Sequence, residues 1–261
     1  KRRSEGPVLR FPPRRILVAV EFTKASLFAW EAAREIAGRF GASLEAVWCG
    51  PPESRVTALK RLRARLGPGA RVHAVKGDPV PAIRRLARRR ACDLIVMGAH
   101  RRPGLVRWVQ GSVAEAVVHG VPCPVLIVPR AWRAPKWILA PVNDAAYARR
   151  GLLAAAVLAR AYKARLALLR IAEDSVKGPY AAGRVSALAE KLPPAVSRDV
   201  RPELEVRVGN PVVEILRAQH GRDMIVLVAH RKSLLGDMVL GTTVERVLRH
   251  SRVPVLAIPS R

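Results

Sequence analysis

Two stretches of the chain carry residues suited to binding an anion. Residues 97–112 read MGAHRRPGLVRWVQGS, and residues 227–242 read LVAHRKSLLGDMVLGT. Each follows a short apolar run and ends in Gly-Ser or Gly-Thr before an amphipathic segment, which predicts a strand, an irregular loop and the start of a helix. In that arrangement backbone N–H groups and the helix N-terminus converge on a negatively charged group. A Ser or Thr at a helix start also caps the helix, so capping alone is the alternative interpretation.

The two stretches belong to an internal repeat. Three equivalent pairs are each 130 residues apart: His100 and His230, Gly111 and Gly241, Pro124 and Pro254. Residues 138–142 also repeat the apolar run 16–20, and Gly209-Asn-Pro repeats Gly77-Asp-Pro. A register kept over this many elements indicates a duplicated domain. The expected division is a basic, proline-rich linker at 1–15, a first domain at 16–130 and a second at 136–260.

Short apolar runs alternate with helical patterns in both halves. The first half predicts strands at 16–20, 43–48, 71–75, 93–97 and 125–128, and helices at 26–40, 56–66, 79–90 and 112–119. The second half repeats this series, with residues 138–142, 147–162, 166–170 and 223–228 matching elements of the first. Such alternation is typical of an α/β fold with a parallel sheet and helices on both faces. Ligands of these sheets bind beyond the carboxyl ends of the strands, where the strand order reverses. We therefore expect Val20, Glu21 and the loop from Gly98 to Ser112 to form one crevice.

The composition limits the classes of function. With 47 Lys and Arg against 20 Asp and Glu, the net charge of +27 implies attraction to polyanions, although a solvated basic surface is the simpler explanation. No apolar run approaches the length of a membrane span, and no signal peptide is recognisable, so we expect a cytoplasmic protein. The three cysteines lie far apart, which favours free thiols and predicts no metal site.

No catalytic constellation is found, and we expect a protein that is not an enzyme. The nucleotide-binding, zinc-protease and serine-hydrolase patterns GxxxxGK[ST], GxGxxG, HExxH and GxSxG are all missing from the sequence. His100 is a candidate for a phosphate contact, or else for a hydrogen bond to the backbone. Asp93 and Asp223 precede buried strands and are expected to serve turns or helix caps.

These residues resemble the universal stress protein family in a tandem arrangement. The hallmark of the family is a strand followed by Gly, two residues, Gly, nine residues and then Gly-Ser or Gly-Thr. Here the first half has Gly98, Arg101 and Gly111-Ser112 at these positions, and the second has Val228, Arg231 and Gly241-Thr242. The resemblance implies two Rossmann-like, flavodoxin-like domains, each with a five-stranded parallel sheet. They would pack as a pseudo-dimer through residues 125–128 and 255–258. It also implies ATP held by the loop, with binding rather than catalysis as the activity.

Departures from the family pattern favour the first half as the nucleotide site. Arginine replaces the second loop glycine in both halves, and Val228 replaces the first glycine in the second half. The aspartate usual after the first strand is Glu21, and Asn143 in the copy. ATP is therefore expected in the first half rather than the second. The expected contact residues are Val20, Glu21, Gly98, His100, Arg101, Gly111, Ser112, Gly241 and Thr242.

Three classes of function stay open from the sequence. The first is a regulatory stress-response module that senses a nucleotide of the ATP or AMP class. The second is a cytoplasmic regulatory domain of a membrane transporter, an amino-acid permease or a cation/proton antiporter. It would lie at the membrane face, with a degenerate site and a homodimeric assembly. The start at Lys1 rather than Met and the basic, proline-rich residues 1–15 favour this class and suggest a piece of a longer protein. A nucleic-acid binder ranks last, because only the charge supports it.

Overall fold

The computed structural model describes residues 11–67, 70–99, 113–143, 145–172 and 199–260 except 235, 236 and 241, together with 183, 187 and 190. For 231–234, 237–240 and 242 it describes the backbone alone. The chain divides into two compact units. Pro13–Trp132 forms the N-terminal unit, and Arg133–Arg261 makes up most of the C-terminal unit. None of the helices described is long and apolar enough to cross a membrane.

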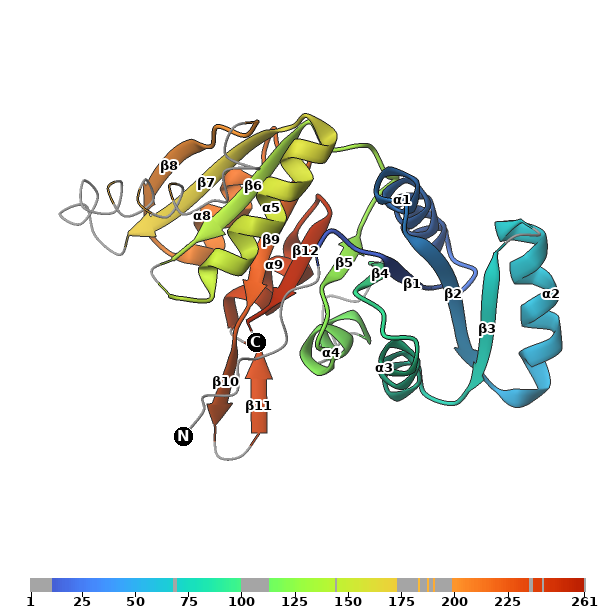
Figure 1. Ribbon diagram of the computed structural model, residues 1–261. Coiled ribbons are helices and arrows are strands. Elements are labelled where there is room, and N and C mark those ends of the chain that lie inside the picture. Colours follow the sequence, from blue (N-terminus) through green and yellow to red (C-terminus); the bar gives the residue numbers. More distant parts are fainter. Residues whose placement is uncertain are drawn as a thin grey trace, which may run out of the picture. The chain divides into compact units, whose positions relative to one another are not determined.

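The N-terminal unit alternates strands and helices around a parallel sheet (Figure 1). Its elements are β1 (Arg15–Ala19), α1 (Lys24–Phe40), β2 (Ser43–Gly50), the 3₁₀ turn η1 (Pro52–Ser54), α2 (Arg55–Leu66), β3 (Arg71–Lys76), α3 (Pro79–Arg89), β4 (Leu94–Gly98), α4 (Val113–Gly120) and β5 (Val125–Val128). The strand order is β3-β2-β1-β4-β5, and each neighbouring pair is parallel. The order reverses between β1 and β4, which is where the sequence predicts the ligand.

The C-terminal unit repeats this order. Its elements are β6 (Trp137–Val142), α5 (Ala148–Tyr162), β7 (Arg165–Ala172), β8 (Glu203–Val208), α8 (Pro211–Ala218), β9 (Met224–Ala229), β10 (Arg231–Leu234), β11 (Asp237–Leu240), α9 (Thr242–His250) and β12 (Val255–Pro259). The parallel sheet runs β12-β9-β6-β7-β8. The predicted α/β fold, with a five-stranded parallel sheet in each half, is confirmed. The packing of the two halves as a pseudo-dimer stays a prediction.

The central strands are buried on both faces, as their unbroken apolar runs predict. Ile16, Leu17 and Val18 of β1 are at most 1% exposed, and Ile138 and Leu139 of β6 are fully buried. Strands flanked by neighbours on both edges and by helices on both faces have no solvent-facing side, which is why period-two alternation is missing from their sequences.

The repeated Gly-Asp-Pro and Gly-Asn-Pro sequences make the same turn in both units. Gly77 and Gly209 have φ angles of 102° and 138°, a region that residues with a Cβ rarely adopt. Asp78 then caps α3 by accepting a hydrogen bond from the Val80 N–H, and Asn210 caps α8 in the same way. Proline follows at the first helical position, where no N–H is needed.

Asp93 and Asp223 hold the amino ends of the strands together, and do not cap helices or turns as expected. One carboxylate oxygen of Asp93 accepts the backbone N–H groups of Arg14 and Arg15, at 2.9 and 2.8 Å. Asp223 accepts those of Lys136 and Trp137, both at 2.9 Å. Asp93 therefore joins the beginning of β4 to that of β1, and Asp223 joins the beginning of β9 to that of β6. Both lie at the amino ends of the strands, opposite the predicted site.

The loop predicted after the fourth strand of the second half is a β-hairpin, so an irregular loop was wrong for this copy. Strands β10 and β11 pair antiparallel, from Arg231 opposite Leu240 to Leu234 opposite Asp237. Figure 1 shows the hairpin extending from the end of β9. The equivalent loop of the first half, residues 100–112, lies outside the described residues.

Glu45 is a buried carboxylate that ties three elements of the N-terminal unit. It is 7% exposed, and Arg90 donates to both of its oxygens, from Nε at 2.9 Å to Oε2 and 3.2 Å to Oε1 and from Nη2 at 2.5 Å to Oε1. His73 Nε2 lies 2.7 Å from Oε2, the oxygen that also accepts the 2.9 Å bond from Arg90 Nε. Burial by itself would raise the pKa of Glu45, but the bonds from Arg90 and His73 outweigh it and bring the pKa below its usual 4.5.

Glu45→Gln is expected to lower the free energy of unfolding at pH 7 by about 1–2 kcal/mol, because it removes the ion pair with Arg90. The loss stays modest because water still reaches the Arg90 side chain. Since the pKa of Glu45 is depressed in the folded state, its contribution is present above pH 4.5 and is lost as the pH falls through the folded-state pKa. Urea unfolding of both proteins between pH 7 and pH 3 should show the difference shrinking below pH 4.5. Glu31→Gln, at an exposed position of α1, is the control. A difference independent of pH would contradict this account.

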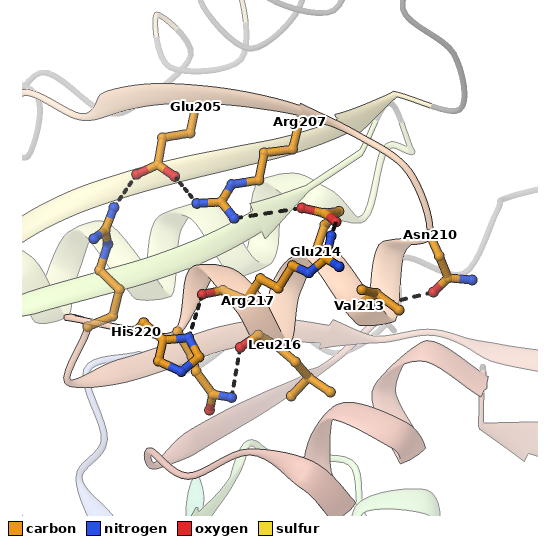
Figure 2. A network of polar contacts seen from close by, with 10 residues as sticks. Glu205, Arg207, Asn210, Val213, Glu214, Leu216, Arg217 and His220 are labelled. Atoms are coloured by element: carbon orange, nitrogen blue, oxygen red, sulfur yellow. Dashed lines mark hydrogen bonds and ion pairs between the residues drawn. The ribbon is translucent and has the colours of Figure 1, made fainter.

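In the C-terminal unit a chain of ion pairs joins β8 and α8, the equivalents of β3 and α3 (Figure 2). Arg207 of β8 lies between Glu205 and Glu214, 3.7 Å from each carboxylate. Glu214 also accepts a hydrogen bond from Arg217 at 2.8 Å, and Glu205 pairs with Arg222. Here acids and arginines alternate, so the positive charges of β8 and α8 are neutralised locally.

Candidate functional site

The predicted site residues of the first half meet at the carboxyl ends of β1 and β4. Val18 is opposite Val96 in the register of the two strands, which brings Val20 opposite Gly98 two residues further on. Val20 is 2% exposed and donates its N–H to the Val47 carbonyl of β2, so β1 stays in the sheet up to this point. Glu21 follows at an exposed position. The structure thus brings Val20, Glu21 and Gly98 together.

Gly98 allows the first turn of α1 to pack directly on the end of β4. A Cβ on Gly98 would lie 2.5 Å from the carbonyl carbon and oxygen of Ala25 and 2.8 Å from the Ser26 nitrogen. Such contacts are with backbone, which no side-chain rotation relieves. Thr23 caps this turn by accepting the Ser26 N–H at 3.2 Å. The helix N-terminus, with its partial positive charge, is therefore held beside the predicted site.

At the same carboxyl end of the sheet, acidic groups lie near a cysteine thiol. Burial and, to a smaller extent, the Glu21 and Asp78 carboxylates together raise the pKa of Cys49, at the end of β2, to about 11. Cys49 is therefore a protonated, weakly nucleophilic thiol at neutral pH. A protonated Cys49 thiol does not suit nucleophilic catalysis at this end of the sheet.

The remaining predicted contacts fall outside what the structure describes. His100, Arg101, Gly111 and Ser112 lie in residues 100–112, immediately before α4, and Gly241 immediately precedes α9. Thr242 is the first residue of α9. Their roles stay predictions. Among the described residues, no group of three His, Cys, Asp or Glu side chains is placed to hold a metal ion.

In the second half the equivalent position to Gly98 is filled. Val228 of β9 packs against α5 where Gly151 has no side chain, and a Cβ on Gly151 would lie 2.6 Å from a Val228 methyl group. The glycine of this close contact is on the strand in the first unit and on the helix in the second, so Val228 fills space that the α1 backbone takes beside Gly98. A valine at this position also lacks the backbone freedom of the glycine found in phosphate-binding loops.

An aromatic pair stacks at the same end of the second sheet. Tyr147, just before α5, and His230, just after β9, stack with ring centroids 4.6 Å apart and an interplanar angle of 11°. The Tyr147 hydroxyl is 3.2 Å from the amide nitrogen of Asn143, the residue that follows β6. Side chains from three segments thus contact each other where Glu21, Ala25 and Gly98 lie in the first half.

Sequence reasoning missed Tyr147 and Gly151, although a signal was present. Aligning 138–142 with 16–20 places Tyr147 at the position of Ala25, the residue whose backbone meets Gly98. A large aromatic residue at the position of a small one predicts that a side chain fills the equivalent site of the second half. Its stacking partner could not be identified without knowing that β6 and β9 are neighbours.

Two tandem parallel sheets, each with its strand order reversed beside the first strand of the unit, define a class of duplicated α/β proteins. The universal stress protein family model matches residues 50–129 and 135–259. The chain belongs to the universal stress protein family.

Similar chains share the fold across both units. A universal stress protein from Archaeoglobus fulgidus superposes with a TM-score of 0.76 at 18% identity, over 95% of this chain and 98% of its own. A structure from Pseudomonas aeruginosa gives a TM-score of 0.72 at 22% identity, over 95% and 94% of the two chains. A universal stress protein of Methanocaldococcus jannaschii is 42% identical over 62 residues, which are 23% of this chain and 36% of that relative.

Proposed function

We propose that the protein is a non-catalytic regulatory module that binds an adenine nucleotide, ATP in the first instance, in its N-terminal unit. The observation that carries the proposal is the packing of the α1 N-terminus on Gly98 at the reversal of strand order. Ligands of open parallel sheets bind at this point, and helix N-termini favour phosphate groups there. Membership of the universal stress protein family supports a stress-response role.

Three features of the C-terminal unit argue that it does not bind the nucleotide. Val228 fills the position of Gly98, and the Tyr147–His230 stack lies at the ends of β6 and β9. The segment after β9 forms the β10–β11 ladder, which commits backbone N–H groups to inter-strand hydrogen bonds that a phosphate-binding loop would leave for its ligand. We therefore expect one nucleotide per chain.

A titration with ATP tests this proposal. We expect the melting temperature of the N-terminal unit to rise with ATP concentration, because a ligand that binds the folded state stabilises it by about 2.7 kcal/mol at a hundredfold excess over Kd. Equilibrium dialysis should give one ATP per chain, recovered unhydrolysed.

Variants locate the site. Val228→Ala, in the C-terminal unit, should leave ATP binding unchanged, whereas a substitution at Gly98 should remove it. The proposal fails if millimolar ATP gives no shift, or if the Val228 variant rather than the Gly98 variant loses binding.

Association with a membrane transporter, a position at the cytoplasmic face of the membrane and assembly into a homodimer remain proposals drawn from the sequence. The basic residues of the chain support the first two through their attraction to an anionic surface. Light scattering on the purified chain tests the third: a mass of twice 28.6 kDa at micromolar concentration supports a homodimer, and a monomer mass contradicts it.

A further inference from the structure

The outer edge of the N-terminal unit carries a high density of positive charge. Between Arg55 and Arg90 the sequence has twelve Lys and Arg residues and one acid, Asp78. These residues lie on α2, on the edge strand β3 and on α3. In Figure 1, α2 and α3 lie on opposite sides of β3, so the charges surround this edge of the sheet. We call the surface formed by the exposed cations of α2, β3 and α3 the basic edge.

The side chains of the basic edge face the solvent. Helix α3 buries Ala82, Ile83, Leu86 and Ala87 against the sheet and exposes arginines on its other face. The exposed cations are Arg55, Lys60, Arg61, Arg63, Arg65, Arg71, Lys76, Arg85, Arg88, Arg89 and Arg90. Within the described contacts, Arg90 is the member of this group with an ion pair, to Glu45.

The duplicated unit provides an internal comparison. The strand and helix equivalent to β3 and α3, residues 203–223, contain three arginines and four acids, whereas residues 71–93 contain seven Lys and Arg and two acids. In the C-terminal unit Arg207 and Arg217 pair with Glu214, as Figure 2 shows, and Arg222 pairs with Glu205. An arginine-rich composition alone would affect both copies alike. The basic edge is therefore a property of one copy, which a general bias in composition does not explain.

We propose that the basic edge docks the protein on a bilayer surface that carries anionic phospholipid headgroups. Clustered arginines and lysines attract such a surface over about a Debye length, and each guanidinium can bind a phosphate through two N–H groups. Val56, the second residue of α2, is 64% exposed beside these cations and offers an aliphatic side chain to the interface.

The described surface fits a lipid layer better than a nucleic acid. Single strands are held mainly by stacking on exposed aromatic side chains, and no Phe, Tyr or Trp among the residues described is exposed. The cations also lie on two helices and the edge strand between them instead of on one helix aimed at a groove, the usual arrangement in duplex readers. This docking does not depend on the nucleotide site, which lies at the carboxyl ends of β1 and β4.

A vesicle sedimentation assay with charge-reversed variants tests the docking. The test variant is Arg85→Glu, Arg88→Glu and Arg89→Glu on the exposed face of α3. The control is Arg149→Glu, Lys163→Glu and Arg201→Glu at exposed positions of the C-terminal unit, which changes the net charge equally. Vesicles contain phosphatidylcholine alone or with about 30% phosphatidylglycerol, at about 150 mM salt. Circular dichroism and ATP-dependent melting should show that both variants stay folded.

We expect the unmodified protein and the control to bind the anionic vesicles, with affinities within about threefold of each other, and the α3 variant to bind at least about tenfold more weakly. Neutral vesicles should bind none of the three. Equal losses in both variants would show a generic effect of net charge and overturn the proposal. So would tighter binding to a 20-base-pair duplex than to the anionic vesicles, which would assign the basic edge to nucleic acid.

Discussion

Gly98→Val is expected to lower the free energy of unfolding of the N-terminal unit by about 2–4 kcal/mol and to abolish ATP binding. The Cβ alone would lie 2.5 Å from the Ala25 carbonyl, so the first turn of α1 must move away from β4. That movement takes the helix N-terminus away from the switch point, and stability and binding are lost together. Urea unfolding and equilibrium dialysis measure the two effects.

Gly38→Ala is the matched control for this substitution. Gly38 lies inside α1, and a Cβ there has no neighbour within 4 Å. Alanine is the better helix former, so this change should stabilise the unit by about 0.5–1 kcal/mol and leave ATP binding intact. If Gly98→Val were as stable as the original protein, α1 would not depend on the close approach described for it.

Asp93→Ala is expected to destabilise the N-terminal unit by about 2–4 kcal/mol, since it leaves two backbone N–H groups, those of Arg14 and Arg15, without their acceptor. Asp93 is 5% exposed, so water replaces the carboxylate poorly. Chemical denaturation followed by circular dichroism measures the loss.

Asp93→Asn separates hydrogen bonding from charge. Both N–H groups bond to the same oxygen, Oδ1, which the amide of asparagine retains. We expect this variant to lose less than half as much stability as Asp93→Ala. Equal losses would mean that the negative charge, and not the hydrogen bonds, stabilises the strand ends. Asp223→Ala should act in the same way on the C-terminal unit, through Lys136 and Trp137.

Much of the fold could be predicted from the sequence, because its elements are encoded locally. Apolar runs such as 16–20 and 94–97 fit only a strand with both faces buried, and the 130-residue register carries that prediction to the second half. The turn residues at Gly77 and Gly209 were recognised as equivalent from their neighbours alone. The edge strand β8 was not predicted, although Glu203–Val208 alternates charged and apolar residues as a half-buried strand does. Leu204 and Val208 are more than 40% exposed there.

The candidate site was only partly predictable, because its geometry depends on contacts between distant segments. Val20 and Gly98 could be placed together from the expected strand order. The stack of Tyr147 on His230 and the fit of Val228 to Gly151 join residues 77 or more positions apart, and no local pattern encodes them. The sequence analysis predicted an irregular loop after β9 and not the β10–β11 hairpin, because residues 231–240 show no regular alternation of apolar and polar residues.

The carboxylates of Asp93 and Asp223 bear on how the two copies could diverge. Each carboxylate holds the amino ends of two strands together by hydrogen bonds. The strand order therefore does not depend on contacts at the opposite rim of the sheet, where the strands end. Insertions, ring stacks and a new ladder could accumulate there during evolution without unravelling the domain. In the second copy that rim carries the Tyr147–His230 stack and the β10–β11 ladder, while Asp223 keeps the strand starts together.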